Sequence, residues 1–302
     1  MRKVTVASAV SALLLIAMRP AFAHGVEIDP RSSLEAWIAG VLLLSALLYA
    51  RGLYRLRRSA GAHRGGIRRS AVFFALGWIV LAAALVSPLA GATEGLFSAH
   101  MIQHELLMVV GAPLMVLARP LAIWTWALRP AWRGRAAMVF RQKGVASAWE
   151  LISTPAAASV LHAVAIWVWH APALFEGAEV SVGLHALQHS AFLFTALLFW
   201  WALLKPGRRG GVGAAVVCLF LTMLHTAALG VLLTFSRDVW YPKSTSAAHD
   251  WGLTALEDQQ LGGLIMWVPG GLPYVIAALL LAARWFTSGP SAPRSRVDAA
   301  PH

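Results

Sequence analysis

The sequence predicts an all-α fold: a polytopic membrane helical bundle with seven transmembrane helices after an N-terminal signal peptide. The first observation behind this prediction is composition, because 59% of the 302 residues are hydrophobic and only 13% are charged. Soluble proteins hold about 45–50% apolar and about 25% charged residues. Second, the apolar residues lie in blocks of about 20, the length that crosses a bilayer as a helix. Third, basic residues gather between alternate blocks, as in the cytoplasmic loops of membrane proteins.

These observations exclude several classes of protein. A soluble enzyme, a disordered regulator and a secreted disulfide scaffold each have a different composition, and the single cysteine, Cys218, allows no intramolecular disulfide. A net charge of +12 would suggest a nucleic-acid partner in a soluble protein. Here membrane topology accounts for the charge, so we expect a lipid bilayer as the environment and no nucleic acid.

Residues 1–23 are typical of a secretory signal peptide. Arg2 and Lys3 begin it, an apolar stretch too short for a full span follows, and Ala21-Phe22-Ala23 is a small-x-small cleavage site. Cleavage there would make His24 the mature N-terminus, where its α-amine and imidazole could together chelate Cu(II). The alternative is an uncleaved additional helix, which leaves the later topology unchanged.

Residues 24–286 are expected to form one seven-helix transmembrane domain. The apolar blocks lie at residues 34–54, 70–90, 98–118, 151–171, 183–204, 212–235 and 260–286. Each is long enough to cross a hydrocarbon core of about 30 Å. Within the last block, the run from Pro269 to Pro273 predicts a kink or an unwound segment. Residues 287–302 are predicted to form a disordered cytoplasmic tail.

The distribution of Lys and Arg predicts the orientation of these spans. Most basic residues after the signal lie in the connections that follow the first, third and fifth spans, and in the C-terminal tail. Such segments stay on the cytoplasmic side. The expected location is therefore the bacterial inner membrane, with the N-terminus periplasmic after cleavage and the C-terminus cytoplasmic.

Histidines are the most informative residues of the sequence. The third and fifth spans each begin on the outer side with His-x-x-Gln-His, at His100/His104 and His185/His189. Residues four positions apart share a helix face, and His170, at the outer end of the fourth span, reaches the same level. A histidine inside a span is a functional hypothesis by default, and neutral imidazole is the commonest metal ligand. We therefore predict a periplasm-facing metal site built from these five histidines.

Several side chains nearby are secondary candidates for the metal site. Thioethers favour Cu(I), although methionine in an apolar helix often serves packing alone; the candidates are Met101, Met108 and Met266. Asp258, at the outer end of the last span, has two interpretations. It belongs to the metal site as a ligand or as an acceptor for a histidine N–H, or it caps a helix at the interface.

His162 and His225 differ from the other histidines because they lie near the middle of their spans. They are candidates for a second, deeper metal position. Alternatively, they are core histidines that hydrogen bond to neighbouring helices.

Taken together, these motifs resemble the CtaG family of caa-type cytochrome c oxidase assembly factors, in its multi-span membrane form. The resemblance runs from about residue 34 to 286 and rests on His100-Met101-Ile102-Gln103-His104-Glu105-Leu106-Leu107-Met108, Trp169-His170-Ala171-Pro172, His185-Ala186-Leu187-Gln188-His189 and the segment from Asp258 to Trp267. It implies a seven-helix membrane chaperone that is needed to build active haem–copper oxidase and that handles copper on the outer side.

For the site, the resemblance carries over His100, His104, His170, His185, His189, Asp258 and Met266. It implies that copper, expected as transiently bound Cu(I), passes to cytochrome c oxidase subunits. Periplasmic copper chaperones are further expected partners.

The residues alone leave two other functions open. In a haem- or quinone-binding redox protein, histidines on facing helices would be axial haem ligands. In a copper transporter, Met108, His162 and His225 would mark a path across the bilayer. We find no arrangement of nucleophile, base and orienting group for covalent catalysis, and we expect an assembly factor rather than an enzyme.

Overall fold

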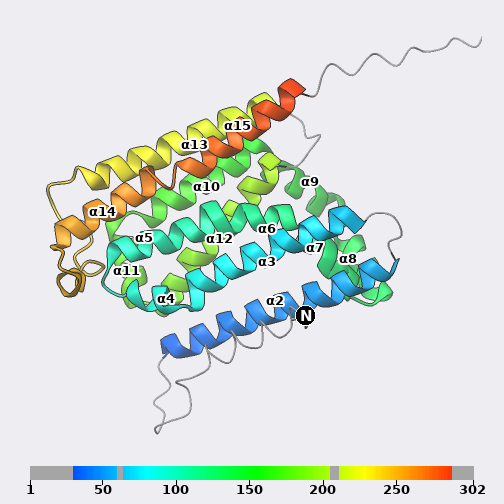
Figure 1. Ribbon diagram of the computed structural model, residues 1–302, viewed down its shortest axis with the longest axis horizontal. Coiled ribbons are helices and arrows are strands. Elements are labelled where there is room, and N and C mark those ends of the chain that lie inside the picture. The colour runs from blue at the N-terminus through cyan, green and yellow to red at the C-terminus, as the bar shows by residue number, and fades with distance from the viewer. Residues whose placement is uncertain (1–29, 60–63, 205–210, 288–302) are drawn as a thin grey trace, which may run out of the picture.

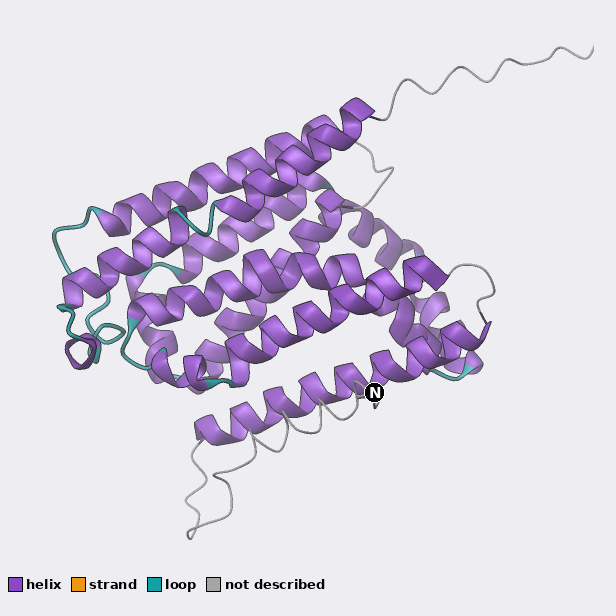
Figure 2. Cartoon of the chain, viewed as in Figure 1, coloured by secondary structure: helices purple, strands orange, loops and turns teal. Residues whose placement is uncertain are grey.

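The computed structural model describes residues 30–59, 64–204 and 211–287 of the chain. In this part of the chain, the regular elements are helices and no strand is present (Figures 1 and 2). The predicted all-α fold is thereby confirmed. The predicted signal peptide, His24 and residues 288–302 of the predicted tail lie outside the described residues.

Six helical segments are long and apolar enough to cross a membrane. They are α2 (Pro30–Ser59), α3 with α4 (Arg64–Val86 and Pro88–Ala92), α5 with the π-helix η1 and α6 (Phe97–Glu105, Leu106–Gly111 and Ala112–Ala118), α12 (Val182–Leu204), α13 (Gly211–Thr234), and α14 with α15 (Ala255–Trp267 and Leu272–Thr287). The segments lie side by side in one bundle (Figure 1). They match six of the seven blocks predicted from the sequence.

The fourth block, predicted as one span over residues 151–171, is bent. α9 (Lys143–Ile152) and α10 (Pro155–Trp169) meet at 72°, so the described chain has seven candidate spans only if this pair counts as one. Pro155 explains the break, because proline disfavours helical backbone at the preceding residue and suits the first turn of a helix. The Thr154 hydroxyl accepts a hydrogen bond from the Ala157 N–H at 3.2 Å and so caps α10.

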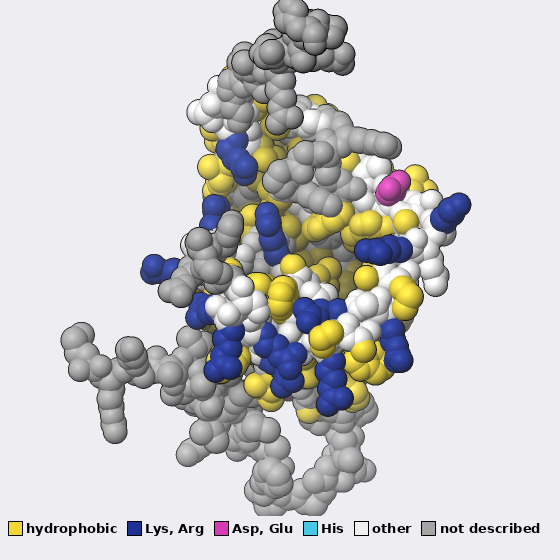
Figure 3. Space-filling view, turned by 90° about the vertical axis from the view of Figure 1, so that its right-hand side faces the viewer, with side chains coloured by type: hydrophobic (Ala, Val, Ile, Leu, Met, Phe, Trp, Pro, Cys, Tyr) yellow, Lys and Arg dark blue, Asp and Glu magenta, His cyan; other side chains and the backbone are white. Residues whose placement is uncertain are grey.

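The connection between the third and fourth spans is itself helical, which the sequence analysis did not predict. It consists of α7 (Pro120–Ala127) and α8 (Pro130–Arg141), which lead into α9 of the bent pair. Lys and Arg side chains crowd this end of the bundle (Figure 3). We call it the arginine end, and we call the opposite end, which carries the paired histidine motifs, the histidine end.

The last span is broken as its glycines and prolines predict. α14 ends at Trp267 and α15 begins at Leu272, and Pro269, Gly270 and Gly271 lie between them. Proline cannot donate the backbone hydrogen bond that a continuous helix needs. The break leaves α14 as a separate short helix at the histidine end.

Two glycines set the position of α14 against α13. A Cβ atom on Gly230 of α13 would lie 2.8 Å from the Gly263 carbonyl oxygen and 2.9 Å from Trp267 Cβ. A Cβ atom on Gly263 would lie 2.6 Å from the Thr234 backbone nitrogen. Small residues allow two membrane helices to approach this closely. The crossing fixes α14, and with it Asp258.

Gly230→Ala is therefore expected to destabilise the protein by about 1–3 kcal/mol, the usual cost of overpacking. The added methyl group meets backbone atoms that cannot rotate away. Thermal unfolding in detergent measures the effect. The matched control is Gly213→Ala on the same helix, where a Cβ atom meets nothing within 4 Å. Equal stability of the two variants would contradict the close crossing.

Candidate metal centre

Five histidine side chains meet at the histidine end of the bundle. His100 and His104 come from α5, His185 and His189 from the first turns of α12, and His170 from the residue that ends α10. Ring centroids lie 4.4 Å apart for His100 and His104, 5.1 Å for His104 and His189, 4.2 Å for His185 and His189, and 6.2 Å for His104 and His170. The structure thus brings all five predicted residues together.

Three of these histidines have the geometry of a metal-ligand set. One ring nitrogen each from His100, His104 and His189 lies within 4.8 Å of the other two. Nitrogens bound to a single ion at about 2.0 Å stand about 3.3–3.5 Å apart. Small side-chain rotations would therefore close the three rings on an ion.

The ring nitrogens at the centre of the cluster are buried without hydrogen bonds. Both nitrogens of His100, both of His104 and Nε2 of His170 have no hydrogen-bond partner among the described residues. Such a buried polar group costs about 1–3 kcal/mol. In native proteins, a buried polar group without a hydrogen bond usually binds a water or an ion, or has a chemical role. A neutral imidazole carries a lone pair on one of its two nitrogens, and a bound metal ion would take that lone pair from each ring.

The tautomer of His170 leaves Nε2 as a ligand atom. Its Nδ1 lies 2.7 Å from the Ile166 carbonyl oxygen, and a carbonyl can only accept, so Nδ1 carries the proton. Nε2 then carries the lone pair. Histidine ligands in metal sites are commonly oriented by such a bond from the other ring nitrogen.

Tyr241, in the loop between α13 and α14, holds the backbone of His170. The fully buried phenol donates a hydrogen bond to the His170 carbonyl oxygen at 2.6 Å. Burial, and then the carboxylate of Glu176, raise the pKa of Tyr241, so the phenol keeps the proton that it donates. No motif in the sequence pointed to this tyrosine.

Gln103 links the two histidine motifs. Its amide Nε2 donates to the Ala84 carbonyl oxygen at 2.7 Å. This bond directs Oε1 toward His189 Nε2 at 3.0 Å. His189 Nδ1 faces the His185 carbonyl oxygen at 3.2 Å. Both ring nitrogens of His189 thus face acceptors, and a neutral imidazole has one proton to give. Binding a metal through Nε2 would require His189 to leave Gln103.

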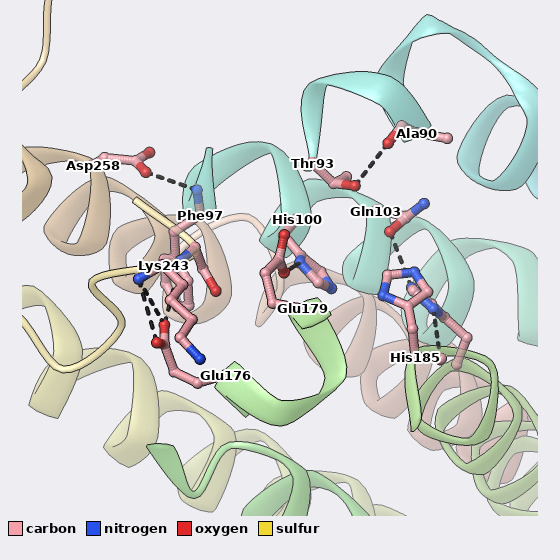
Figure 4. Close-up of polar contacts among 12 residues, drawn as sticks. Ala90, Thr93, Phe97, His100, Gln103, Glu176, Glu179, His185, Lys243 and Asp258 are labelled. Carbon is pink, nitrogen blue, oxygen red and sulfur yellow. Dashed lines mark hydrogen bonds and ion pairs between the residues drawn. The ribbon is translucent and has the colours of Figure 1, made fainter. Parts of the chain in front are cut away.

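Asp258 caps the helix that carries His100 and His104. Its fully buried carboxylate accepts the backbone N–H of Phe97 at 2.7 Å and that of Ser98 at 3.0 Å (Figure 4). These are the first two residues of α5, where backbone donors lack helical partners. The sequence left Asp258 as either a member of the metal site or a helix cap. Its hydrogen bonds to Phe97 and Ser98 are those of a helix cap.

α11 (Pro172–Val180) covers the histidine cluster from outside the spans. Phe175 is fully buried, and its ring centroid lies 5.0 Å from that of His100 and 5.8 Å from that of His170. Glu179 Oε2 lies 3.6 Å from His100 Nδ1 (Figure 4). Glu176 accepts the backbone N–H of Lys243 at 3.0 Å, which joins α11 to the loop after α13.

Glu179 is a site residue that the sequence analysis missed. The only signal was an acidic residue in a short outer segment, and such residues are usually solvated loop charges. Its position one helical turn after Glu176, beyond Pro172, indicates a helix that begins at the proline. Nothing in the sequence indicates that this helix folds back over His100.

The three methionine candidates lie in the hydrophobic core. Met101, Met108 and Met266 are at most 3% exposed and belong to one core cluster. A Cβ atom on Gly262 would lie 3.1 Å from Met101 Cγ, so Met101 packs against α14. These contacts are those of packing side chains.

His162 and His225 lie apart from the five clustered histidines. His162 Nδ1 bonds to the Thr195 hydroxyl at 3.0 Å, and His225 Nδ1 accepts the Trp167 indole N–H at 3.3 Å. These bonds fit the core interpretation, although Nε2 of each ring is buried without a hydrogen-bond partner in the described chain.

Tyr241→Phe is expected to destabilise the protein by about 1–3 kcal/mol, because it leaves the buried His170 carbonyl without its donor. The aromatic contacts of the ring with Phe97 and Phe175 are kept. Thermal unfolding measures the loss. A variant as stable as the natural protein would show that the phenol does not hold His170 in solution.

Comparison with known proteins places this chain in a family. Residues 47–288 match the family model described as cytochrome c oxidase caa3 assembly factor (Caa3_CtaG). Uncharacterized proteins of Mycobacterium bovis and Mycobacterium tuberculosis are each 27% identical to the chain over 262 residues, and one of Mycobacterium leprae is 25% identical over 260 residues. No solved structure matches the chain.

The mycobacterial relatives are much longer than this chain. The alignments cover 82–83% of the chain but only 38–39% of those proteins. The family match itself spans all six candidate membrane segments apart from the first part of α2.

Proposed function

Because this chain belongs to the cytochrome c oxidase caa3 assembly factor family, we propose that it binds copper at the histidine cluster and delivers it to a nascent haem–copper oxidase. In this proposal, copper is the cargo. His100, His104 and His189 are its principal ligands, and His170 and His185 are neighbouring ligands that take part in exchange.

The single observation that carries this proposal is the set of buried ring nitrogens that make no hydrogen bond within the described chain. His100 and His104 each place both nitrogens in the protein interior without a hydrogen bond from the described residues. A purely structural histidine is expected to satisfy at least one ring nitrogen, as His162 does with Thr195. Lone pairs held together in this way suit a metal ion.

The donor set limits the choice of metal. Imidazole suits zinc, copper, iron and nickel, and the ring nitrogens within 4.8 Å of one another all belong to histidine. Among these metals, the function of the family favours copper, because haem–copper oxidases contain it. We expect Cu(I), which needs few ligands and is bound well by imidazoles.

Delivery requires a site that releases its metal. His189 provides one reason for release, since Gln103 Oε1 competes for the nitrogen that would bind the ion. The anionic Glu179 beside His100 provides another, because it offers an alternative ligand. A closed structural site lacks such competing groups.

The direction of delivery follows from the charges at the two ends of the bundle. The arginine end is the expected cytoplasmic side, so the histidine cluster faces the periplasm. Copper would come from periplasmic copper chaperones and pass to an oxidase subunit within the same membrane.

Bound haem is a poor fit to the histidine cluster. The rings contact one another directly, with centroids of His100 and His189 5.8 Å apart and His104 packed 4.7 Å from Phe192. A macrocycle between two such ligands would need the helices to separate.

The proposal is tested by purifying the protein in detergent with and without copper. Bound metals are measured by mass spectrometry, together with a visible spectrum. We expect about one copper per chain, no Soret band, and loss of copper in the His100→Ala, His104→Ala, His189→Ala variant. His249→Ala is the matched control, because His249 is exposed on the short helix η2 (Ala248–Trp251). Stoichiometric iron with a Soret band, or copper retained by the triple variant, would overturn the proposal.

A further inference from the structure

A cavity of about 490 Å³ lies beside the histidine cluster. Its walls come from the outer half of α2, from α3 and α4, from α5 and η1, and from the end of α11 and the first half of α12. His185, His189 and Gln103 form part of the wall. The cavity therefore touches both histidines of the second motif.

The cavity wall changes in polarity from the histidine end inward. Three carboxylates line its outer part: Glu35 on α2, Glu94 after α4 and Glu179 at the end of α11. Leu81, Leu107 and Leu193 line its deeper part. Glu35 and Glu94 are exposed, so the outer part reaches the surface. A cation is attracted to such a mouth and is stopped by an apolar floor.

The outer half of α2 forms a loosely packed side of this cavity. Near the arginine end, α2 is held tightly: a Cβ atom on Gly52 would clash with the Ile123 carbonyl oxygen, and Tyr49 stacks on Phe74. At the other end, Trp37 is 73% exposed although it lines the cavity. In Figure 1 this end of α2 lies apart from the neighbouring helices.

The geometry points to this cavity as the route by which a copper ion enters and leaves the histidine cluster. Glu35 and Glu94 attract the ion at the mouth. Glu179 and His185 receive it, since Glu179 contacts His100 and the His185 ring lies 5.5 Å from that of His100. The ion then reaches His100, His104 and His189. This inference rests on the proposed function and adds the route to it.

The inner end of the route is controlled by Gln103. Both Gln103 and His189 line the cavity, and their hydrogen bond of 3.0 Å occupies the His189 nitrogen that would bind the ion. The bond to Ala84 keeps the Gln103 amide in this orientation. Gln103 is a positioning residue that draws His189 away from the ion and so favours release.

Blocking the cavity tests the route. Ser190 on α12 is exposed and lines the cavity, so Ser190→Trp fills the space without entering the core. Leu187→Trp is the matched control, because Leu187 is exposed on the same helix and is not among the lining residues. The measurement is the rate of Cu(I) loading, and the rate of removal by a soluble Cu(I) chelator, in detergent-solubilised full-length protein.

We expect Ser190→Trp to slow loading and removal at least tenfold with unchanged copper stoichiometry, and Leu187→Trp to exchange copper at the natural rate. If Ser190→Trp binds copper and exchanges it at the natural rate, the route is wrong and the proposed function stands. If the natural protein binds no copper, the proposed function itself fails.

A second variant avoids any effect of Trp on folding. Ser190→Cys in a Cys218→Ser background is purified without metal and then modified with a bulky thiol reagent. Cu(I) loading and removal should be at least tenfold slower in the modified protein than in the unmodified protein. Unchanged exchange after complete modification would overturn the route.

Substituting the glutamine of each motif tests whether Gln103 positions His189. Gln103→Leu is expected to slow Cu(I) removal at least fivefold, because His189 no longer has a competing acceptor. Gln188→Leu is the matched control, since the buried Gln188 amide has no hydrogen-bond partner in the described structure. If the chelator removes Cu(I) from the Gln103→Leu variant as fast as from the Gln188→Leu variant, Gln103 does not have this positioning role.

Discussion

His104→Ala is expected to weaken copper binding by at least about 100-fold, beyond the 10–100-fold typical of losing a group that only orients a ligand. His104 is 1% exposed and lies at the centre of the cluster, with ring contacts to His100, His170 and His189. Removing it takes away one of the three close nitrogens and leaves a two-histidine site. Competition titration with a Cu(I) chelator measures the change.

Packing and binding must be separated in this experiment, because a truncated core side chain leaves a cavity that destabilises the fold. His104→Leu fills most of the space beside Phe192 and provides no ligand. We expect it to fold with the stability of the natural protein and to bind copper as weakly as His104→Ala. Copper affinity within twofold of the natural protein in His104→Leu would contradict the role assigned to His104.

Asp258→Ala is expected to destabilise the protein by about 3 kcal/mol or more, since two buried backbone donors lose a charged acceptor at about 1–3 kcal/mol each. The favourable interaction of the carboxylate with the N-terminus of α5 is lost as well. The first turn of α5 carries His100, so copper binding should weaken together with stability. Thermal unfolding and copper titration of the same preparation measure both effects.

Two further substitutions distinguish the loss of the helix cap from the loss of a negative charge at this end of the protein. Asp258→Asn keeps one acceptor oxygen and should lose about half as much stability as Asp258→Ala. Asp250→Ala removes an exposed carboxylate on η2 and should change stability by less than about 0.5 kcal/mol. If Asp258→Ala unfolds at the temperature of the natural protein, the cap does not position α5.

The spans could be predicted from the sequence because length and hydropathy are local properties. Six of the seven predicted blocks coincide with helices that can cross a membrane. The fourth differs because Pro155 breaks it, and the proline was visible in the sequence. The helices between the third and fourth spans were missed because they are short and because Arg residues lie within α8 and directly before α7 and α8, so the segment resembles a cytoplasmic loop.

The histidine cluster could be predicted in outline for a similar reason. A spacing of four residues places His100 and His104, or His185 and His189, on one helix face. Both motifs start at the same end of their spans, which brings the pairs to one level. Helix geometry and topology together are sufficient for this prediction.

The groups that support the cluster could not be predicted in the same way. Asp258 caps a helix that begins 161 residues earlier in the chain. Gln103 bonds to His189, 86 residues away, although the glutamines of the two motifs are indistinguishable in the sequence. Such contacts depend on how the helices rotate against one another, which periodicity does not determine.

Copper binding by the histidine cluster is tested most directly by the X-ray absorption spectrum of copper in the loaded protein, recorded for the natural sequence and for His104→Leu. We expect a coordination shell of imidazole nitrogens without sulfur in the natural protein, and loss of that shell in the variant. A shell containing sulfur would point to Met101, Met108 or Met266 instead. That result, or an identical spectrum in the two proteins, would contradict copper binding by the histidine cluster.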